Sequence, residues 1–93
     1  MEIIRYLGEQ LAKKINISPP AARGLLKLSI KDELGPFIAL DKISYNELSK
    51  VLHNSLKKRL INLKISNYEE IVIFMTRELE LNQSLITMAG VYL

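Results

Sequence analysis

Apolar residues recur at spacings of three and four along several segments of this chain, and that repeat places them on one face of an α-helix. The first such stripe consists of Ile4, Leu7, Leu11 and Ile15, with charged residues at the positions between them. A helix of this kind is stabilised mainly by packing its apolar face against another element. The chain is therefore expected to fold as a set of packed helices.

Residues that start and stop helices mark the boundaries between these stripes. Ser18-Pro19-Pro20 is typical of a helix start, because Ser caps free amides and Pro is tolerated in the first turn. Gly35-Pro36 ends that helix, since the residue before Pro is disfavoured in the helical region. Two Ser-x-x-Glu patterns, at 44–47 and 66–69, have the form of a capping box. We predict helices near 2–15, 19–34, 45–63 and 67–81.

The sequences of three apolar runs are compatible with a strand. Residues 37–40 are too few for periodicity to decide, and we interpret them as a connection. Residues 71–74 are β-prone when read alone, but the cap before them and the polar residues after them favour a helix, with a strand as the alternative. For residues 86–93 the pattern leaves the choice open.

Length and composition limit the architecture. A chain of 93 residues can bury one modest core. Apolar residues make up 48% of it, aromatics only 6%, and Trp is absent, so Leu, Ile and Val must supply the interior. We predict an all-α fold, a compact bundle of four to five helices in a single domain over residues 1–93. Gly24, inside the second predicted helix, is expected to mark a close helix contact.

The chain lacks the residue patterns of an enzyme. It has no Cys, which excludes disulfides, thiolate metal sites and a catalytic thiol. The one His, His53, lies within a predicted helix and away from any nucleophile motif, and the four glycines are too isolated to form a phosphate-binding loop. We expect no catalysis, no cofactor, no metal and no small-molecule substrate.

The ends of the chain indicate the compartment. Charges interrupt the N-terminal residues where a signal peptide needs an apolar stretch. The apolar run at 84–93 is about half of the roughly 20 residues that a membrane helix requires. A cytoplasmic protein without a membrane partner is the expectation.

Charge alternates along the chain. Residues 1–31 and 50–64 are basic, and the second of these segments contains no acid, whereas 32–49 and 65–93 are acidic on balance. The net charge is only +3. This alternation predicts charge complementarity between packed helices.

One local pattern lies at the junction of the first two predicted helices. Residues 8–28 resemble the helix-turn-helix of DNA-binding regulators, with Asn16 where that motif usually has Gly. The residues that carry the resemblance are Ala12, Ile15, Asn16, Ile17, Ser18, Ala22 and Leu25. The resemblance implies that 19–28 is a recognition helix, with Arg23 and Lys27 directed toward the major groove of double-stranded DNA. Lys57, Lys58 and Arg59 would then contact backbone phosphates.

A second functional hypothesis rests on the apolar end of the chain. The fourth predicted helix is apolar around much of its circumference, and an exposed apolar surface commonly marks a protein-protein contact. We predict a non-enzymatic interaction module with a regulatory role, which forms a homodimer or docks on a protein partner. The predicted interface residues are Phe74, Leu85, Ile86, Met88, Val91 and Tyr92. The alternative is that residues 85–93 close the core of the same chain.

Overall fold

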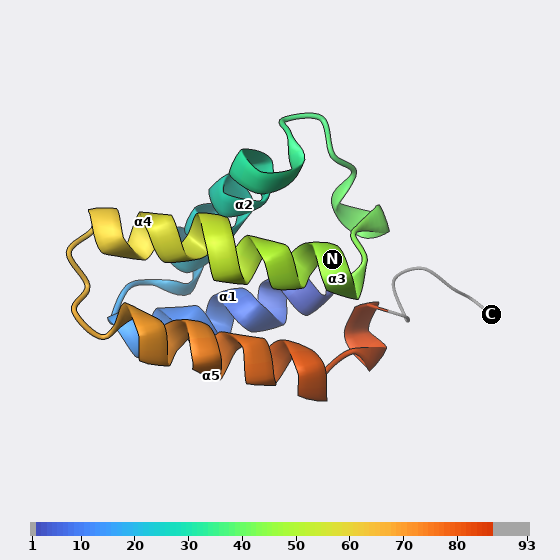
Figure 1. The fold of residues 1–93 in the computed structure, drawn as a ribbon. Helices are drawn as coiled ribbons and strands as arrows, with labels where there is room; N and C mark the ends of the chain where they lie inside the picture. The colour runs from blue at the N-terminus through green and yellow to red at the C-terminus, as the bar shows by residue number, and fades with distance from the viewer. Residues whose placement is uncertain (1, 87–93) are drawn as a thin grey trace.

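The structure, a computed structural model, describes residues 2–86. Figure 1 shows these residues as helices joined by short connections. They are α1 (Glu2–Ile15), α2 (Pro19–Leu34), the 3-10 turn η1 (Leu40–Lys42), α3 (Tyr45–Lys50), the π-helical segment η2 (Val51–Leu56), α4 (Lys57–Asn62) and α5 (Tyr68–Leu81). The predicted all-α bundle is confirmed, and the described part of the chain contains no strand.

The predicted helix boundaries agree closely with the observed ones. The first two helices begin and end where the pattern placed them, and α5 starts one residue later than predicted. The predicted helix 45–63 is observed as one continuous rod over 45–62, made of α3, η2 and α4, which we call the middle helix. Its π-helical segment is a departure from the expected regular helix, and nothing in the apolar spacing indicated it. Residues 37–39 form a connection, as predicted, and Leu40 begins the 3-10 turn η1.

Two of the three predicted caps are present. Ser18 accepts a hydrogen bond from the amide of Ala21, and Ser44 forms a reciprocal capping box with Glu47. The third prediction, a capping box at 66–69, is wrong. Because α5 begins at Tyr68, its N-cap is Asn67, and Ser66 lies one residue too early to cap the first turn.

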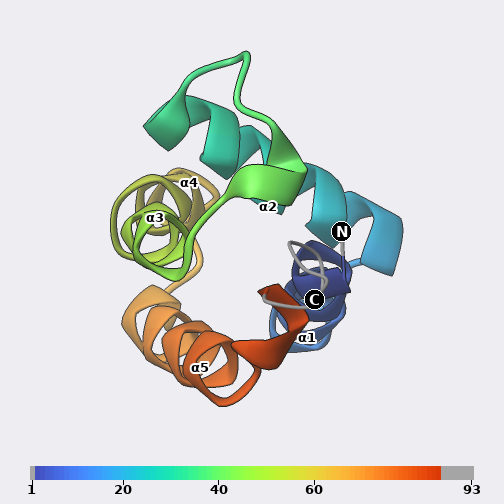
Figure 2. The same ribbon diagram turned by 90° about the vertical axis from the view of Figure 1, so that its right-hand side faces the viewer.

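An aliphatic core lies between the four rods. Viewed along the bundle, α1, α2, the middle helix and α5 surround it as a ring, with α2 and α5 diagonally opposed (Figure 2). Its fully buried large side chains are Ile3, Leu7, Leu11, Leu26, Ile30, Ile43, Leu48, Leu52, Leu56, Leu60, Ile71 and Met75. Among residues 2–86, every helix is too short or too polar to cross a lipid bilayer.

A polar contact joins the first and last helices. The Tyr6 hydroxyl on α1 donates a hydrogen bond to the Glu78 carboxylate on α5. This hydrogen bond, together with burial, raises the pKa of the Tyr6 phenol above its ordinary value of 10.0. The contact closes the ring of helices on the side where α1 meets α5.

The close helix contact occurs at Gly8 rather than at Gly24. A Cβ atom on Gly8 would lie 2.5 Å from Cγ and 3.3 Å from Cα of Arg23, so α2 packs directly on the backbone of α1 there. A Cβ on Gly24 would meet nothing within 4 Å. The expectation for Gly24 was therefore wrong, because that residue lies on the outer surface of α2.

The two glycines predict opposite effects of one substitution. Gly24→Ala should raise the free energy of unfolding by roughly 0.5–1 kcal/mol, since Ala is the better helix former and the space is open. Gly8→Ala should lower it by about 1–2 kcal/mol, because overpacking against Arg23 outweighs that gain. Urea unfolding followed by circular dichroism measures both. Equal effects of the two substitutions would contradict the helix packing described above.

Candidate interaction surfaces

The described residues of the predicted apolar interface lie against the bundle. Phe74 is half-buried on α5, and the ammonium of Lys14 lies 4.1 Å from its ring centroid. Leu85 and Ile86 are also half-buried and pack against the core. Met88, Val91 and Tyr92 lie outside the described residues. Among the described members, the side chains thus contribute to the edge of the core more than to a free surface.

Two other apolar side chains of α5 are the exposed ones. Ile73 is 62% exposed and Leu81 is 71% exposed. Sequence reasoning missed them because it treated the whole apolar helix as one surface. The usable signal was the position of Ile73, which is two residues from both Ile71 and Met75 and therefore on the opposite side of the helix. Since Ile71 and Met75 are buried in the core, Ile73 faces outward.

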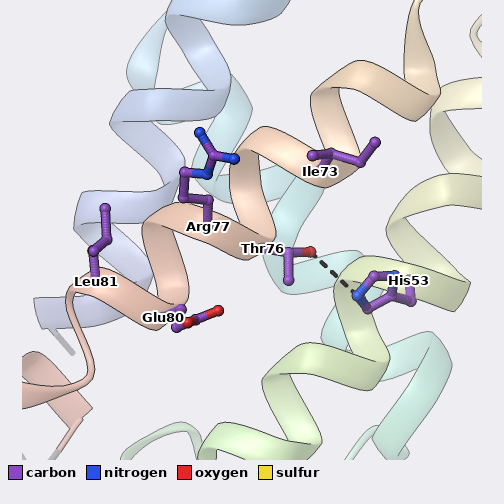
Figure 3. Close-up of a pocket in the computed structure, with 6 residues that line it drawn as sticks. All are labelled: His53, Ile73, Thr76, Arg77, Glu80 and Leu81. Atoms are coloured by element: carbon purple, nitrogen blue, oxygen red, sulfur yellow. Dashed lines mark hydrogen bonds between the residues drawn. The ribbon is translucent and has the colours of Figure 1, made fainter.

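A shallow cleft runs along the outer edge of α5, where this helix meets the middle helix. Its lining residues are His53, Ile73, Thr76, Arg77, Glu80 and Leu81. Figure 3 shows Thr76 directed at His53, whereas the side chain of Arg77 points away from His53. A smaller depression continues it past His53 to Lys57 and Glu69. The exposed isoleucine borders both hollows.

The hydrogen bonds of Thr76 set the orientation of the histidine. Its hydroxyl donates to the carbonyl of Val72 at 2.8 Å and lies 3.3 Å from Nε2 of His53. One hydroxyl has one proton to donate, so His53 donates from Nε2 and Thr76 accepts. The contact ties the π-helical segment to α5 and involves no second base or nucleophile.

Charged residues flank Ile73 on both sides along α5. Glu69 lies four residues before it and Arg77 four residues after it, and both are exposed. Neither makes an ion pair within residues 2–86. We call the exposed surface formed by Glu69, Ile73, Arg77, Glu80 and Leu81 the α5 face.

The basic residues of the helix-turn-helix hypothesis separate into two groups. Arg23 is half-buried against Gly8, and Lys27 is exposed beside it. Together with Arg5 they line a hollow that also includes Ile4 and Leu40. Arg5 is paired with Glu2 at 3.0 Å, so Lys27 is the most available cation of this group.

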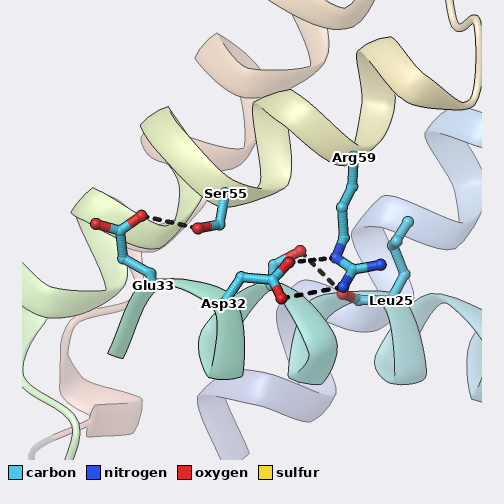
Figure 4. A network of polar contacts seen from close by, with 6 residues as sticks. Leu25, Asp32, Glu33, Ser55 and Arg59 are labelled. Carbon is cyan, nitrogen blue, oxygen red and sulfur yellow. Dashed lines mark hydrogen bonds and ion pairs between the residues drawn. The ribbon is translucent and has the colours of Figure 1, made fainter. Parts of the chain in front are cut away.

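The second group consists of Lys57, Lys58 and Arg59 at the start of α4, and part of it is paired within the chain. Arg59 donates from Nε and Nη2 to the two carboxylate oxygens of Asp32, at 2.6 and 3.1 Å (Figure 4). Beside this pair, Ser55 donates to Glu33 at 2.8 Å. Lys58 lines a hollow with both acids. The ion pair between Arg59 and Asp32 is thus an instance of the predicted charge complementarity between helices.

Lys57 is directed toward α5. Its ammonium lies 5.9 Å from the ring centroid of Tyr68, and it lines the depression next to Glu69. The structure therefore does not bring Lys57, Lys58 and Arg59 onto one surface with Arg23 and Lys27.

The turn between α1 and α2 has a left-handed residue. Asn16 has φ of 58°, a conformation in which Gly is usual and Asn is tolerated. The turn spans 16–18 and ends at the Ser18 cap. Asn16 therefore fills the conformational role that the resemblance assigns to Gly at this position.

No family model, curated protein or solved structure matches the chain. Within residues 2–86, no cluster of three or more His, Cys, Asp or Glu side chains has the arrangement of a metal site.

The pair between Asp32 and Arg59 predicts a pH-dependent stability. Hydrogen bonds from Arg59 hold the pKa of Asp32 below its ordinary value of 3.8. A lowered carboxyl pKa stabilises the fold above the unfolded-state pKa, and that contribution is lost as the pH falls through the lowered value. Asp32→Asn should therefore lower the melting temperature at neutral pH, and the difference from the wild type should shrink below pH 3.8.

Thermal unfolding at a series of pH values measures this difference. Asp41→Asn is the matched control, because Asp41 is exposed and makes no ion pair among residues 2–86. A pH-independent difference for Asp32→Asn, or an equal effect of the control, would show that the ion pair does not contribute.

Proposed function

We propose that this protein is a non-enzymatic helical interaction module that self-associates through the α5 face. The observation that carries the proposal is the exposure of Ile73 and Leu81 on one side of α5, next to the cleft at His53. Scattered single apolar residues are normal on a protein surface. Here Ile73 and Leu81 lie on the same helix and line the same cleft as Arg77 and Glu80. These two charged residues make no ion pair among residues 2–86. An interface with an apolar centre and a polar rim has this composition.

The partner in this proposal is a second copy of the chain. On the α5 face, Glu69 and Arg77 lie at equal distances on either side of Ile73, four residues before it and four residues after it. A surface with this arrangement is complementary to itself, as a two-fold symmetric interface requires. A partner with a uniformly charged helix would match only half of it.

The proposed association is weak and reversible. Burial of one isoleucine side chain contributes roughly 1.5–3 kcal/mol, and the loss of rotational and translational freedom opposes it. A face of five residues per copy is small beside the roughly 20–30 residues of a stable interface. We therefore expect a dimer that dissociates on dilution.

Ile73→Glu should weaken the association without unfolding the chain, since this side chain is 62% exposed. The dissociation constant should rise by about tenfold or more, the equivalent of one lost isoleucine contact. Sedimentation equilibrium or light scattering over a concentration series measures it, with circular dichroism as the check on folding.

Leu28→Glu is the matched control. Leu28 is 47% exposed on α2, the helix diagonally opposed to α5, and receives the same change from apolar to acidic. It should leave the association unchanged. A wild-type chain that stays monomeric at millimolar concentration would overturn the proposal.

DNA binding through α2 is a second candidate, supported by the left-handed Asn16 and the Ser18 cap in a three-residue turn. Over residues 19–28, the exposed surface of α2 is formed by Pro19, Pro20, Ala21, Gly24 and Leu28 beside Lys27. It offers few groups that hydrogen-bond to base edges. Any DNA binding by this helix should therefore depend on phosphate contacts and be nearly independent of base sequence.

Lys27→Glu tests this candidate, because Lys27 is exposed and Arg23 is needed for packing on Gly8. If the candidate is correct, affinity for duplex DNA falls and the slope of log affinity against log salt decreases in magnitude by about 1. Fluorescence anisotropy at several salt concentrations measures both. Lys50→Glu, an equal charge change on α3, should have a smaller effect, and equal losses for the two variants would exclude α2 as the contact.

A further inference from the structure

We infer that the self-association pairs α5 with α5 of a second copy in antiparallel orientation, about a two-fold axis that passes beside Ile73. This inference rests on the proposed function and adds the partner segment, its direction and its register. In the pair, Ile73 packs on the partner's Ile73. Glu69 lies opposite the partner's Arg77, and Arg77 lies opposite the partner's Glu69.

The register follows from the positions of the charges along the helix. With a rise of 1.5 Å per residue, Glu69 and Arg77 lie about 6 Å on either side of Ile73. Antiparallel pairing about Ile73 reverses one copy and brings each carboxylate to the level of a guanidinium. Four residues is also the spacing of one ridge on a helix surface, so the three side chains form a continuous stripe that can pack against its own copy.

Other arrangements of the same helix place like charges together. Parallel pairing in register sets Glu69 against the partner's Glu69 and Arg77 against the partner's Arg77. Antiparallel pairing centred on Arg77 sets the two guanidinium groups against each other, although it brings Ile73 level with the partner's Leu81. Like charges across an interface oppose association. Pairing about Ile73 is the arrangement that matches both charges and keeps an apolar contact at the axis.

In this register, Glu80 and Leu81 of the α5 face also lie near groups of the partner that they can contact. Glu80 lies about 10 Å beyond Ile73, which is about 3 Å past the level where the partner's α5 begins. That helix start has free amides, because its N-cap Asn67 makes no side-chain cap hydrogen bond. A carboxylate near a helix N-terminus is stabilised by the amides and the helix dipole.

Leu81 extends the apolar contact at the same end. It lies about 12 Å from Ile73, whereas the start of the partner's α5 lies about 7.5 Å from it. Leu81 therefore reaches the level of the connection that precedes the partner's α5. That connection includes Leu63, which is 57% exposed.

Single cysteines test the axis directly, because the chain contains no Cys of its own. Helices that pack at about 8–10 Å between axes leave roughly 4–5 Å between Cα atoms that face each other, close enough for a disulfide. Ile73→Cys should form a disulfide-linked dimer under mild oxidation. Leu81→Cys should not, because residue 81 would lie about 24 Å from its own copy along the pair.

The two cysteine variants are matched in exposure, at 62% and 71% for the native side chains, so Leu81→Cys measures the rate of chance collisions. The inference expects Ile73→Cys to cross-link about tenfold faster, since only this pair has disulfide geometry. Equal, fast cross-linking of both would indicate parallel pairing and overturn the antiparallel orientation. Equal, slow cross-linking would overturn the register.

Charge exchange tests the pairing independently. Glu69→Arg alone and Arg77→Glu alone should each self-associate more weakly than the wild type, because each places like charges together at both ends. An equimolar mixture of these two variants should associate as the wild type does, since every contact in the mixed dimer joins opposite charges. The chain that carries both substitutions should also recover self-association.

Glu70→Arg is the control for these charge variants, because it makes the same charge change in the first turn of α5 away from the stripe. It should leave the dissociation constant unchanged. A loss of association equal to that of Glu69→Arg would show that net charge, and not the pairing of Glu69 with Arg77, governs the dimer.

The outcomes separate this inference from the proposed function. A wild-type chain without concentration-dependent mass overturns both. The antiparallel register alone is overturned by a dimer that is lost on Ile73→Glu but is insensitive to the charge variants, and in which Ile73→Cys cross-links no faster than Leu81→Cys. The interaction module is retained in that case.

Discussion

Gly8 allows the backbone of α2 to lie directly on α1, because a side chain there would overlap Arg23. This approach sets the distance between the first two helices, and the remaining rods pack around that pair. The middle helix contacts α2 and α5 contacts α1, so the ring of four rods encloses an aliphatic core. A core without Trp or Cys depends on such close packing, since none of the buried side chains of residues 2–86 is aromatic.

Charge complementarity operates between neighbouring helices at the surface of the bundle. Arg59 on α4 donates a hydrogen bond to Asp32 on α2, and Ser55 donates one to Glu33, the next residue of α2. These contacts use a cation that the helix-turn-helix hypothesis assigned to phosphate binding. The alternating basic and acidic segments are thus explained in part by contacts between neighbouring helices, which leaves a smaller basic surface at Lys27 for any nucleic acid.

The α5 face remains outside these internal contacts. On one side of α5, Tyr6 of α1 contacts Glu78 and Lys14 of α1 contacts Phe74. On the other side, His53 contacts Thr76. Ile73 and Leu81 lie beyond both neighbours. Glu69 and Arg77 make no ion pair within the described part of the chain, and their opposite signs on either side of Ile73 have the symmetry of a surface that binds its own copy. This symmetry connects the fold to the proposed function.

Helix positions could be predicted from the sequence because their signals are local. The apolar spacing in residues 2–15 and the Ser18 and Ser44 caps each depend on residues within a few turns. The second predicted capping box was wrong because the choice between Ser66 and Asn67 as N-cap depends on the turn that precedes α5. Surface assignments depend on which helices become neighbours. That arrangement left Ile73 exposed, drew Phe74 against Lys14 and paired Arg59 with an acid 27 residues away.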